Sequence, residues 1–283
     1  MTFSVQNLSN SIRRRDVSSN HFISRKSFGV LSRKEKARQK SSMQVSIIIP
    51  VFNEAPLIRP FLSNLRERTR GAEIIVVDGA STDGTDQLAQ GLCEQVIRSG
   101  ERSRAKQMNV GADAAGGDVL WFLHADAEVP LESLNEIGRI MRNPKVCGGF
   151  FRIRLPAAPA VYRLTDGFAH YAGLLLRMRC GDHGMFCRRT AFVDAGGFPD
   201  VALMEDVEFF RRLRRCGRVV YSNKRIGASP RRYETVGPIR LTFAYGSIAT
   251  LYLFGVSLST LARIYRRTCC APHEQTILPN VRA

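Results

Sequence analysis

The sequence predicts an α/β protein in which helices flank a sheet. Apolar, strand-forming runs alternate with segments of helical periodicity between residues 45 and 126, which is typical of parallel strands joined by helices. Several of these runs end at acidic or amide side chains. Ligands of such sheets bind beyond the carboxyl ends of the strands, where carboxylates are costly unless a cation or a hydrogen-bond donor meets them. The pattern therefore indicates a ligand site that also holds a metal.

Short strands are expected in the first half of the chain, because Val, Ile and Leu dominate most of the apolar runs. The strands, with the polar residues that follow them, are 45–51 with Asn53 and Glu54, 74–77 with Asp78, 96–97, and 119–123 with His124 and Asp126.

Helices are expected to return the chain between these strands. The first covers 56–70, where Leu57, Phe61 and Leu65 recur at helical spacing and Pro56 is tolerated in the first turn. Further helices are predicted at 85–91, 103–115 and 206–215, further strands at 147–154 and 185–187, and a long apolar helix or helical pair at 156–178.

The stretch Leu241 to Ala262 has 22 consecutive uncharged residues, flanked on both sides by arginines. Its length would permit a membrane span. Ser, Thr and Gly residues dilute its apolar character, however, and Ser257 or Ser259 could begin a separate amphipathic helix. Three alternatives stay open from the sequence: a helical hairpin at the membrane surface, a packed helix of a globular protein, and a true span.

The chain has 283 residues and a formal net charge of +17. Residues 1–43 hold ten Lys or Arg side chains against Asp16 and Glu35 and lack a continuous apolar run, so they do not resemble a secretory signal. They are expected to be a disordered basic leader, a transit-like segment for organelle import, or sequence upstream of the true start. Residues 44–238 are expected to form the main domain, and 239–283 a C-terminal apolar helical unit with a tail.

The basic charge outside the leader suits anionic partners such as nucleotide diphosphates or acidic lipid headgroups. No module that combines aromatic and basic residues for RNA is evident, so no nucleic-acid partner is expected. The seven cysteines include no C-x-x-C pair, which favours a reduced compartment and hence the cytoplasm, with the membrane surface as an alternative.

Over residues 44–235 the sequence resembles the family 2 glycosyltransferases, which have the GT-A fold. This is a Rossmann-like mixed sheet flanked by helices. The motifs that carry the resemblance are VSIIIPVFNEA (45–55), VVDGASTDGT (76–85), GDVLWFLHADAEVP (117–130), LMEDVEFFRRLRRCG (203–217) and SPRRYE (229–234). Their joint occurrence in the family's order is specific, whereas each alone would be weak. RSRAKQMNVGA (102–112) and GDHGMFCRR (181–189) also resemble a subgroup associated with arsenosugar biosynthesis.

The resemblance implies that the chain binds a nucleotide-diphosphate sugar. Asp78 would accept hydrogen bonds from the donor base, and Asn53 and Glu54 would hold the ribose or base. Arg104 would meet a phosphate or the sugar hydroxyls, although a solvent-exposed helix face explains it nearly as well. The expected donor-site residues are Pro50, Asn53, Glu54, Asp78, Arg104, Arg232 and Tyr233, where Tyr233 would lie near the acceptor and Ser229 replaces the Gln that precedes the arginine-aromatic pair in the family.

Asp126 matches the last acid of the family's D-x-D motif, whose carboxylate binds Mg²⁺ or Mn²⁺. Such hard cations prefer oxygen ligands and neutralise a departing diphosphate. The first acid of the motif is His124 in this chain. Imidazole suits Mn²⁺ better than Mg²⁺, so His124 is expected either to join the metal site or to hydrogen-bond the donor.

Asp206 is expected to be the general base, because a carboxylate at a helix N-terminus can take the proton of an attacking hydroxyl. Glu205 would orient it, and Asp182 or His183 would contact the acceptor, a small molecule or a lipid. The sequence thus predicts an inverting, metal-dependent glycosyltransferase. The rival hypothesis is a non-catalytic sensor of sugar nucleotides, or a membrane adaptor, that kept the fold.

Overall fold

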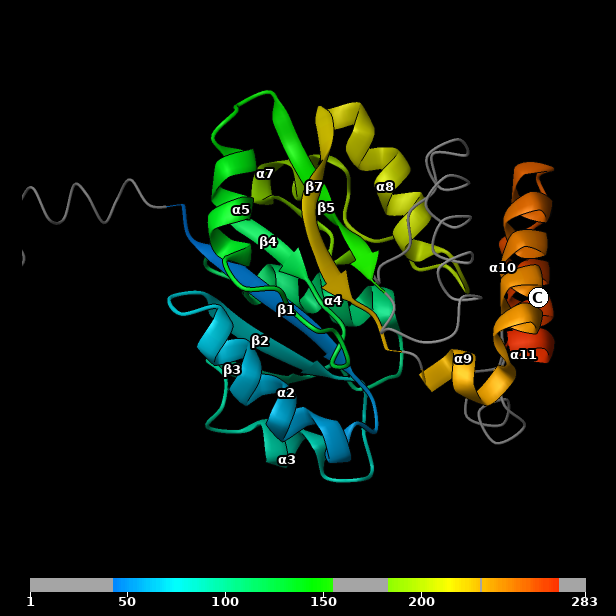
Figure 1. The fold of residues 1–283 in the computed structure, drawn as a ribbon, viewed down its shortest axis with the longest axis horizontal. Helices are drawn as coiled ribbons and strands as arrows, with labels where there is room; N and C mark the ends of the chain where they lie inside the picture. The colour runs from blue at the N-terminus through cyan, green and yellow to red at the C-terminus, as the bar shows by residue number, and fades with distance from the viewer. Residues whose placement is uncertain (1–42, 155–182, 230, 270–283) are drawn as a thin grey trace, which may run out of the picture. The chain divides into compact units, whose positions relative to one another are not determined.

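The computed structural model describes residues 43–154, 183–229 and 231–269, which belong to one compact unit. The expected helix at 156–178 and Asp182 lie outside these ranges. Figure 1 shows a central sheet with helices on both faces and a helical pair at the C-terminal end.

The sheet has the strand order β3-β2-β1-β4-β6-β5-β7. The first four strands of the chain are parallel, β5 and β7 are parallel to each other, and β6 runs antiparallel to both β4 and β5. The mixed sheet of the GT-A fold is thereby confirmed. The strands are β1 (Val45–Val51), β2 (Glu73–Asp78), β3 (Gln95–Arg98), β4 (Val119–Phe122), β5 (Val146–Arg154), β6 (Phe186–Arg188) and β7 (Arg218–Gly227).

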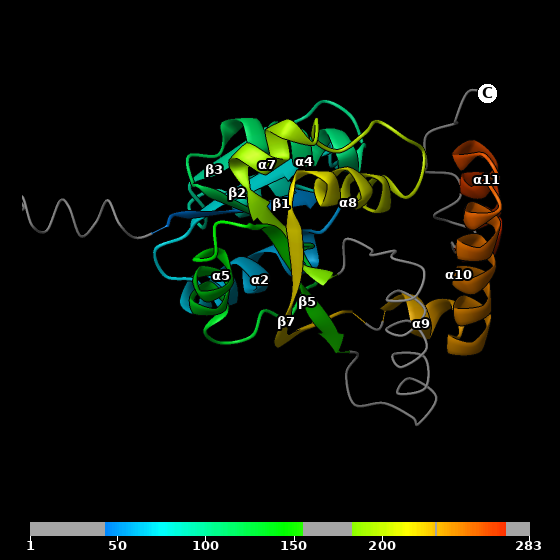
Figure 2. The ribbon, with the colours of Figure 1, turned by 90° about the horizontal axis from the view of Figure 1, so that it is seen from above.

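Each face of the sheet has its own hydrophobic core, because successive strand residues point to opposite faces. Ile47 and Ile49 of β1 face one core, while Ile48 faces the other, and all three are fully buried. The helices of the first face are α2 (Ala55–Arg68), α3 (Thr85–Ala89) and α5 (Ser133–Met141), and those of the second are α4 (Arg104–Ala114), α7 (Arg189–Asp194) and α8 (Glu205–Cys216). Figure 2 shows α2 and α5 on one side of the sheet and α4, α7 and α8 on the other.

Helix α4 lies unusually close to the sheet. A Cβ atom at Gly111 would come within 2.5 Å of Cγ2 of Ile48 and within 3.0 Å of Cγ2 of Val77. Only glycine permits this approach without displacing its neighbours. The close contact brings the first turn of α4 up to the carboxyl ends of β1 and β2, where the acidic side chains gather.

The uncharged stretch 241–262 forms parts of two helices. These are α10 (Pro238–Leu253) and α11 (Leu258–Cys269), preceded by the short α9 (Arg231–Val236). Gly255 has a positive φ of 79° between the two helices, and Oγ of Ser257 accepts a hydrogen bond from the N–H of Thr260. The expectation that a separate helix begins near Ser257 is therefore confirmed. Among the described residues, no helix combines the length and apolar character needed to cross a membrane.

The C-terminal helices pack on each other through Leu241, Ile248 and Leu261. Met204, at the start of α8, packs against the same cluster. A guanidinium nitrogen of Arg211 in α8 also donates to the hydroxyl of Tyr252 at 2.9 Å. The helical pair is thus attached to the helix that carries Glu205 and Asp206.

Candidate functional site

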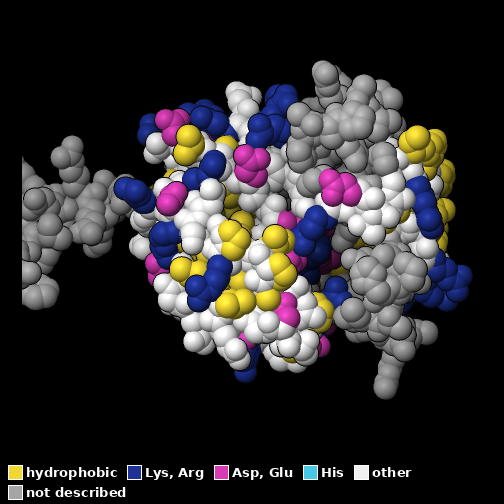
Figure 3. Space-filling view, turned by 60° about the horizontal axis from the view of Figure 1, so that its bottom comes forward, with side chains coloured by type: hydrophobic (Ala, Val, Ile, Leu, Met, Phe, Trp, Pro, Cys, Tyr) yellow, Lys and Arg dark blue, Asp and Glu magenta, His cyan; other side chains and the backbone are white. Residues whose placement is uncertain are grey.

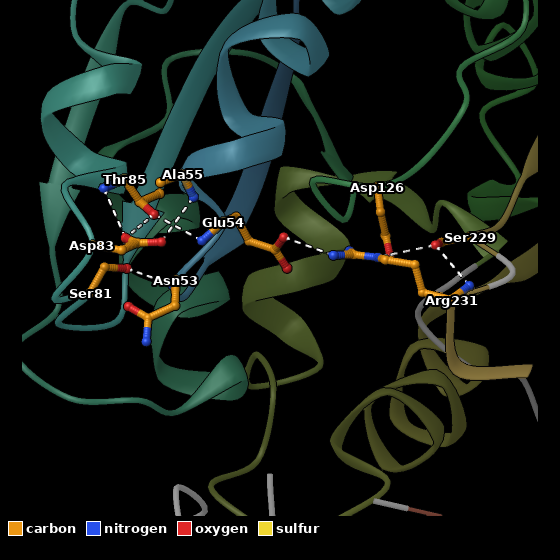
Figure 4. A network of polar contacts seen from close by, with 9 residues as sticks. All are labelled: Asn53, Glu54, Ala55, Ser81, Asp83, Thr85, Asp126, Ser229 and Arg231. Atoms are coloured by element: carbon orange, nitrogen blue, oxygen red, sulfur yellow. Dashed lines mark hydrogen bonds and ion pairs between the residues drawn. The ribbon is translucent and has the colours of Figure 1, made fainter. Parts of the chain in front are cut away.

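The loop after β1 is held by the loop after β2. The side-chain oxygen of Asn53 accepts from the N–H of Thr82, and the N–H of Asn53 donates to Oγ of Ser81, both at 2.9 Å. The N–H of Glu54 donates to the hydroxyl of Thr85 at 2.8 Å. Asn53 has a φ of 53°, which this residue type tolerates better than most. These contacts, of which Figure 4 draws those with Ser81 and Thr85, fix the direction in which Glu54 points.

Asp83 stabilises the contact between these two loops. Its carboxylate accepts from the N–H groups of Ala55 and Thr85, both at 3.0 Å. Burial works against the charge, but the hydroxyl of Thr85 and these N–H groups hold the pKa of Asp83 below its ordinary value. Both carboxylate oxygens of Asp83 already accept hydrogen bonds from these loops. We therefore infer that Asp83 stabilises the loops.

Asp78, at the end of β2, is only 1% exposed. Its Oδ2 accepts from the N–H of Ser81 at 2.9 Å, whereas its buried Oδ1 has no hydrogen-bond partner among the described residues. Buried polar atoms are nearly always satisfied. An acceptor left open at a strand end is the property expected of a carboxylate that awaits a ligand donor.

Gln107 of α4 hydrogen-bonds the ends of β1 and β2 beneath the site. Its amide nitrogen donates to the carbonyls of Val51 and Val77, at 2.8 and 2.7 Å. These two carbonyls lie at the ends of adjacent strands, and a Cβ at Gly79 would lie 3.0 Å from the Gln107 side chain. Gln107 is 3% exposed, so it joins the strand ends to α4 and does not face the ligand space.

Arg231, which was not among the predicted site residues, lies between two predicted acids. Its terminal nitrogens reach Oε2 of Glu54 at 3.3 Å and Oδ2 of Asp126 at 3.0 Å (Figure 4). Burial raises the pKa of Glu54 against the opposing effect of Arg231. Burial alone would lower the pKa of Arg231, but its hydrogen bond with Asp126 and the charge of Glu54 raise it. The three side chains therefore form a charged cluster at the carboxyl ends of β1 and β4.

The acid pair lies at the first turn of α8, as expected. Oδ1 of Asp206 accepts from the N–H of Val207 at 2.7 Å, and Oε1 of Glu205 lies 3.9 Å from a guanidinium nitrogen of Arg104. Met204, directly before the pair, has a φ of 65°. A non-glycine residue in this conformation is strained, and strain of this kind concentrates at functional sites.

A small recess that is partly open to solvent connects these elements. It brings together His124, which follows β4, and the pair Glu205 and Asp206. The side chains that line it are Arg104, Met108, Phe122, Leu123, His124, Met185, Phe198, Glu205 and Asp206.

Some of the predicted residues lie elsewhere or outside the described part. Pro50 is half-buried within β1. The ring of His183 packs against Phe150, with 6.4 Å between ring centroids, and His183 is not among the residues that line the recess. Arg232 and Tyr233 belong to α9, but their side chains lie outside what the structure describes. The roles predicted for these residues stay predictions.

Asp126 offers a divalent cation one carboxylate, whose side chain is 32% exposed. The described residues contain no group of three or more His, Cys, Asp or Glu side chains able to hold a metal by themselves. Mg²⁺ commonly binds through one or two carboxylates and completes its shell with water and substrate phosphates. The donor set fits such a cation, shared with a diphosphate, and does not fit a closed all-protein site.

The fold and its acidic strand ends define the chain as a glycosyltransferase of the GT-A class. The family model for glycosyl transferase family 2 matches residues 46–193. The chain belongs to this family, and the prediction made from the motifs is confirmed.

Two curated relatives are also named as glycosyltransferases. Glycosyltransferase AglE of Haloferax volcanii is 26% identical over 204 residues, which cover 66% of this chain and 67% of that protein. Dolichol-phosphate mannosyltransferase of Pyrococcus furiosus is 31% identical over 108 residues, which cover 36% of this chain and 31% of that protein. Neither name bears on the arsenosugar subgroup, which stays a prediction.

Solved structures share the fold at low identity. A mannosyltransferase from Pyrobaculum calidifontis, in complex with GDP-Man and Mn²⁺, aligns with a TM-score of 0.58 and 22% identity over 78% of this chain and 69% of that one. Glucosyl-3-phosphoglycerate synthase from Mycobacterium tuberculosis, in complex with Mn²⁺, UDP and glucosyl-3-phosphoglycerate, aligns with a TM-score of 0.52 and 18% identity over 81% of this chain and 86% of that one.

Proposed function

We propose that the protein transfers a sugar, with inversion, from a nucleotide-diphosphate donor to a hydroxyl group. The observation that carries this proposal is the shared recess, since it joins His124, two residues before Asp126, to Glu205 and Asp206. A donor whose diphosphate lies near Asp126 would thus place its sugar toward the acid pair.

The donor nucleotide is assigned to the ends of β1 and β2. The open Oδ1 of Asp78 would accept an N–H of the base, and the loop of Asn53 and Glu54 would border the ribose. Asp126 would hold Mg²⁺ or Mn²⁺ on the diphosphate, with His124 beside it. The two solved neighbours are described with Mn²⁺ and a nucleotide ligand, which supports the choice of cofactor. When bound, the cation would neutralise charge on the departing diphosphate.

Asp206 is assigned the chemical step. The acceptor oxygen forms a bond to the anomeric carbon on the face opposite the diphosphate, the bond from that carbon to the diphosphate oxygen breaks, and the acceptor proton passes to Asp206. Inversion follows because entry and departure occur on opposite faces. Glu205 is assigned to positioning, since it lies beside Asp206 and reaches toward Arg104.

The full chain, incubated with UDP-, GDP- and dTDP-sugars, Mn²⁺ or Mg²⁺, and both lipid and small polyol acceptors, tests this function. We expect metal-dependent release of one nucleoside diphosphate, lost in Asp206→Asn while donor binding is kept. Donor binding without turnover by the wild-type protein would instead favour the sugar-nucleotide sensor or adaptor.

We further propose that the α10–α11 pair contacts a membrane surface that holds a lipid acceptor. Large apolar side chains on α10 and directly after it are exposed. Phe243 is 73% exposed and Phe254 is 83% exposed, and Ile239 and Leu253 are exposed to a smaller extent. Arg240, Arg263 and Arg267 are exposed nearby in the sequence, and residues 235–273 contain no acidic residue. Figure 3 shows hydrophobic and basic side chains next to each other at this end of the molecule. Such a surface suits the interface of an anionic bilayer.

A further inference from the structure

One guanidinium contacts two carboxylates at the carboxyl ends of β1 and β4. Arg231 approaches Glu54 with one terminal nitrogen and Asp126 with the other. Asp126 is the carboxylate to which we assign the cation, so Arg231 pairs with a side chain that the cation would also bind. The side chain of Arg231 is 50% exposed, and those of Glu54 and Asp126 are 25% and 32% exposed. The cluster is therefore open to solvent and to an incoming ligand.

Ser229 orients Arg231 for this role. Oγ of Ser229 accepts from the backbone N–H and from Nε of Arg231, both at 3.3 Å (Figure 4). The two terminal nitrogens are then left to face the acids. Ser229 is the position at which the chain departs from the Gln of the family pattern, and the short serine side chain makes these contacts from two residues away.

We propose that Arg231 holds the place of the cation between Glu54 and Asp126, so that the metal binds together with the nucleotide and not before it. This inference rests on the proposed donor site. A terminal nitrogen of Arg231 lies 3.0 Å from Oδ2 of Asp126, so a cation at this carboxylate would meet the positive charge of the guanidinium. The cation and Arg231 therefore compete for the carboxylate of Asp126.

Replacement of the Arg231 guanidinium by a cation at Asp126 is unfavourable when no nucleotide is bound. A free cation would displace Arg231 from Asp126 and leave two positive groups side by side. A diphosphate changes this balance, because it brings oxygen ligands to the cation and offers the released guanidinium a bidentate anionic partner. Metal and nucleotide should therefore strengthen each other's binding, and the coupling must be reciprocal.

The experiment measures Mn²⁺ binding to the full chain by electron paramagnetic resonance, with and without UDP or GDP. We expect weak Mn²⁺ binding by the wild-type protein alone, and at least about fivefold tighter binding with one of the nucleotides, the lower end of typical coupling. Arg231→Gln should bind Mn²⁺ without nucleotide at least about fivefold more tightly than the wild type, and its gain from nucleotide should shrink. Arg231→Lys keeps the positive charge but loses the two terminal nitrogens of the guanidinium. Its Mn²⁺ affinity without nucleotide should lie between those of the wild type and Arg231→Gln.

Arg66→Gln is the matched control. Arg66 pairs with Glu94 near the far end of α2, so its removal changes the net charge equally without touching the site, and Mn²⁺ binding should stay at the wild-type level. Equal Mn²⁺ affinity of the wild type and a folded Arg231→Gln, each without nucleotide, would overturn the place-holding role alone. Absence of Mn²⁺ binding by every variant even with nucleotide would instead overturn the proposed metal site, and the place-holding role with it.

Discussion

Asp78 accepts a hydrogen bond from the backbone N–H of Ser81 through one carboxylate oxygen, and its other oxygen is buried without a partner in the described part of the chain. The first contact fixes the carboxylate plane, and the second oxygen points to a donor that the ligand must supply. A mutation can therefore weaken the contact with the ligand and keep the contact with Ser81.

Asp78→Asn should weaken nucleotide binding without unfolding the protein. An amide keeps the size of the side chain and an acceptor for Ser81, but it loses the charge that strengthens a hydrogen bond from the base. We expect an affinity loss of about 10-fold or more, since a hydrogen bond to a charged group contributes about 1.5–3 kcal/mol. Titration calorimetry with UDP and GDP measures it, and thermal unfolding serves as the control. Unchanged affinity for both nucleotides would contradict the assignment.

Gly111→Ala should destabilise the protein, although alanine favours helices by about 1 kcal/mol over glycine. The added methyl group would lie 2.5 Å from Cγ2 of Ile48, and overpacking of this kind costs about 1–3 kcal/mol. Gly138→Ala in α5 is the matched control, because a Cβ there meets nothing within 4 Å. Urea unfolding should show a lower free energy of unfolding for the first variant and a higher one for the second. A stabilised Gly111→Ala would show that α4 can move away from the sheet.

Glu136 should make stability depend on pH in the acidic range. The guanidinium of Arg139 lowers its pKa to about 2, against the effect of burial and with help from the hydroxyl of Ser222. A carboxyl whose pKa is depressed on folding contributes stability above its unfolded pKa, near 4.5, and that contribution is lost as the pH falls toward 2. Because Arg139 is 59% exposed and screened by solvent, we expect about 1–2 kcal/mol.

Denaturant unfolding between pH 6 and pH 2 measures this contribution. Glu136→Gln should be less stable than the wild type at pH 6, and the difference should shrink as the pH approaches 2. Glu101→Gln, which removes an exposed acid paired with Lys106, should change little over the same range. A pH-independent difference for Glu136→Gln would mean that its packing, and not its charge, sets the effect.

The exposed aromatic residues of the C-terminal helices should determine vesicle binding. Phe243→Ser with Phe254→Ser removes two large apolar side chains that no core covers. Burying one such side chain contributes about 1.5–3 kcal/mol, so sedimentation with anionic vesicles should fall at least about tenfold. Val193→Ser, at a site 68% exposed on α7, is the control and should bind as the wild type does. Equal sedimentation of all three proteins would remove the membrane proposal and leave the transferase proposal intact.

Local patterns predicted much of the fold and of the site. The expected strand 45–51 has the bounds of β1, and the helix expected at 206–215 differs from α8 by one residue at each end. Periodicity and turn residues are properties of short segments, so they can be read without knowledge of the contacts. The acids at the strand ends were found for the same reason, because parallel strands deliver their carboxyl ends to one edge.

The sequence by itself determined the family, the acids and their placement on strand ends, while the tertiary structure decided what meets them. Arg231 contacts Glu54 across 177 residues of sequence and Asp126 across 105. That Arg231 faces the acids depends on the direction in which the chain enters α9 after the end of β7. Gln107 likewise spans two strand ends only because α4 packs so closely. Such contacts follow from the packing of whole elements, which no local pattern encodes.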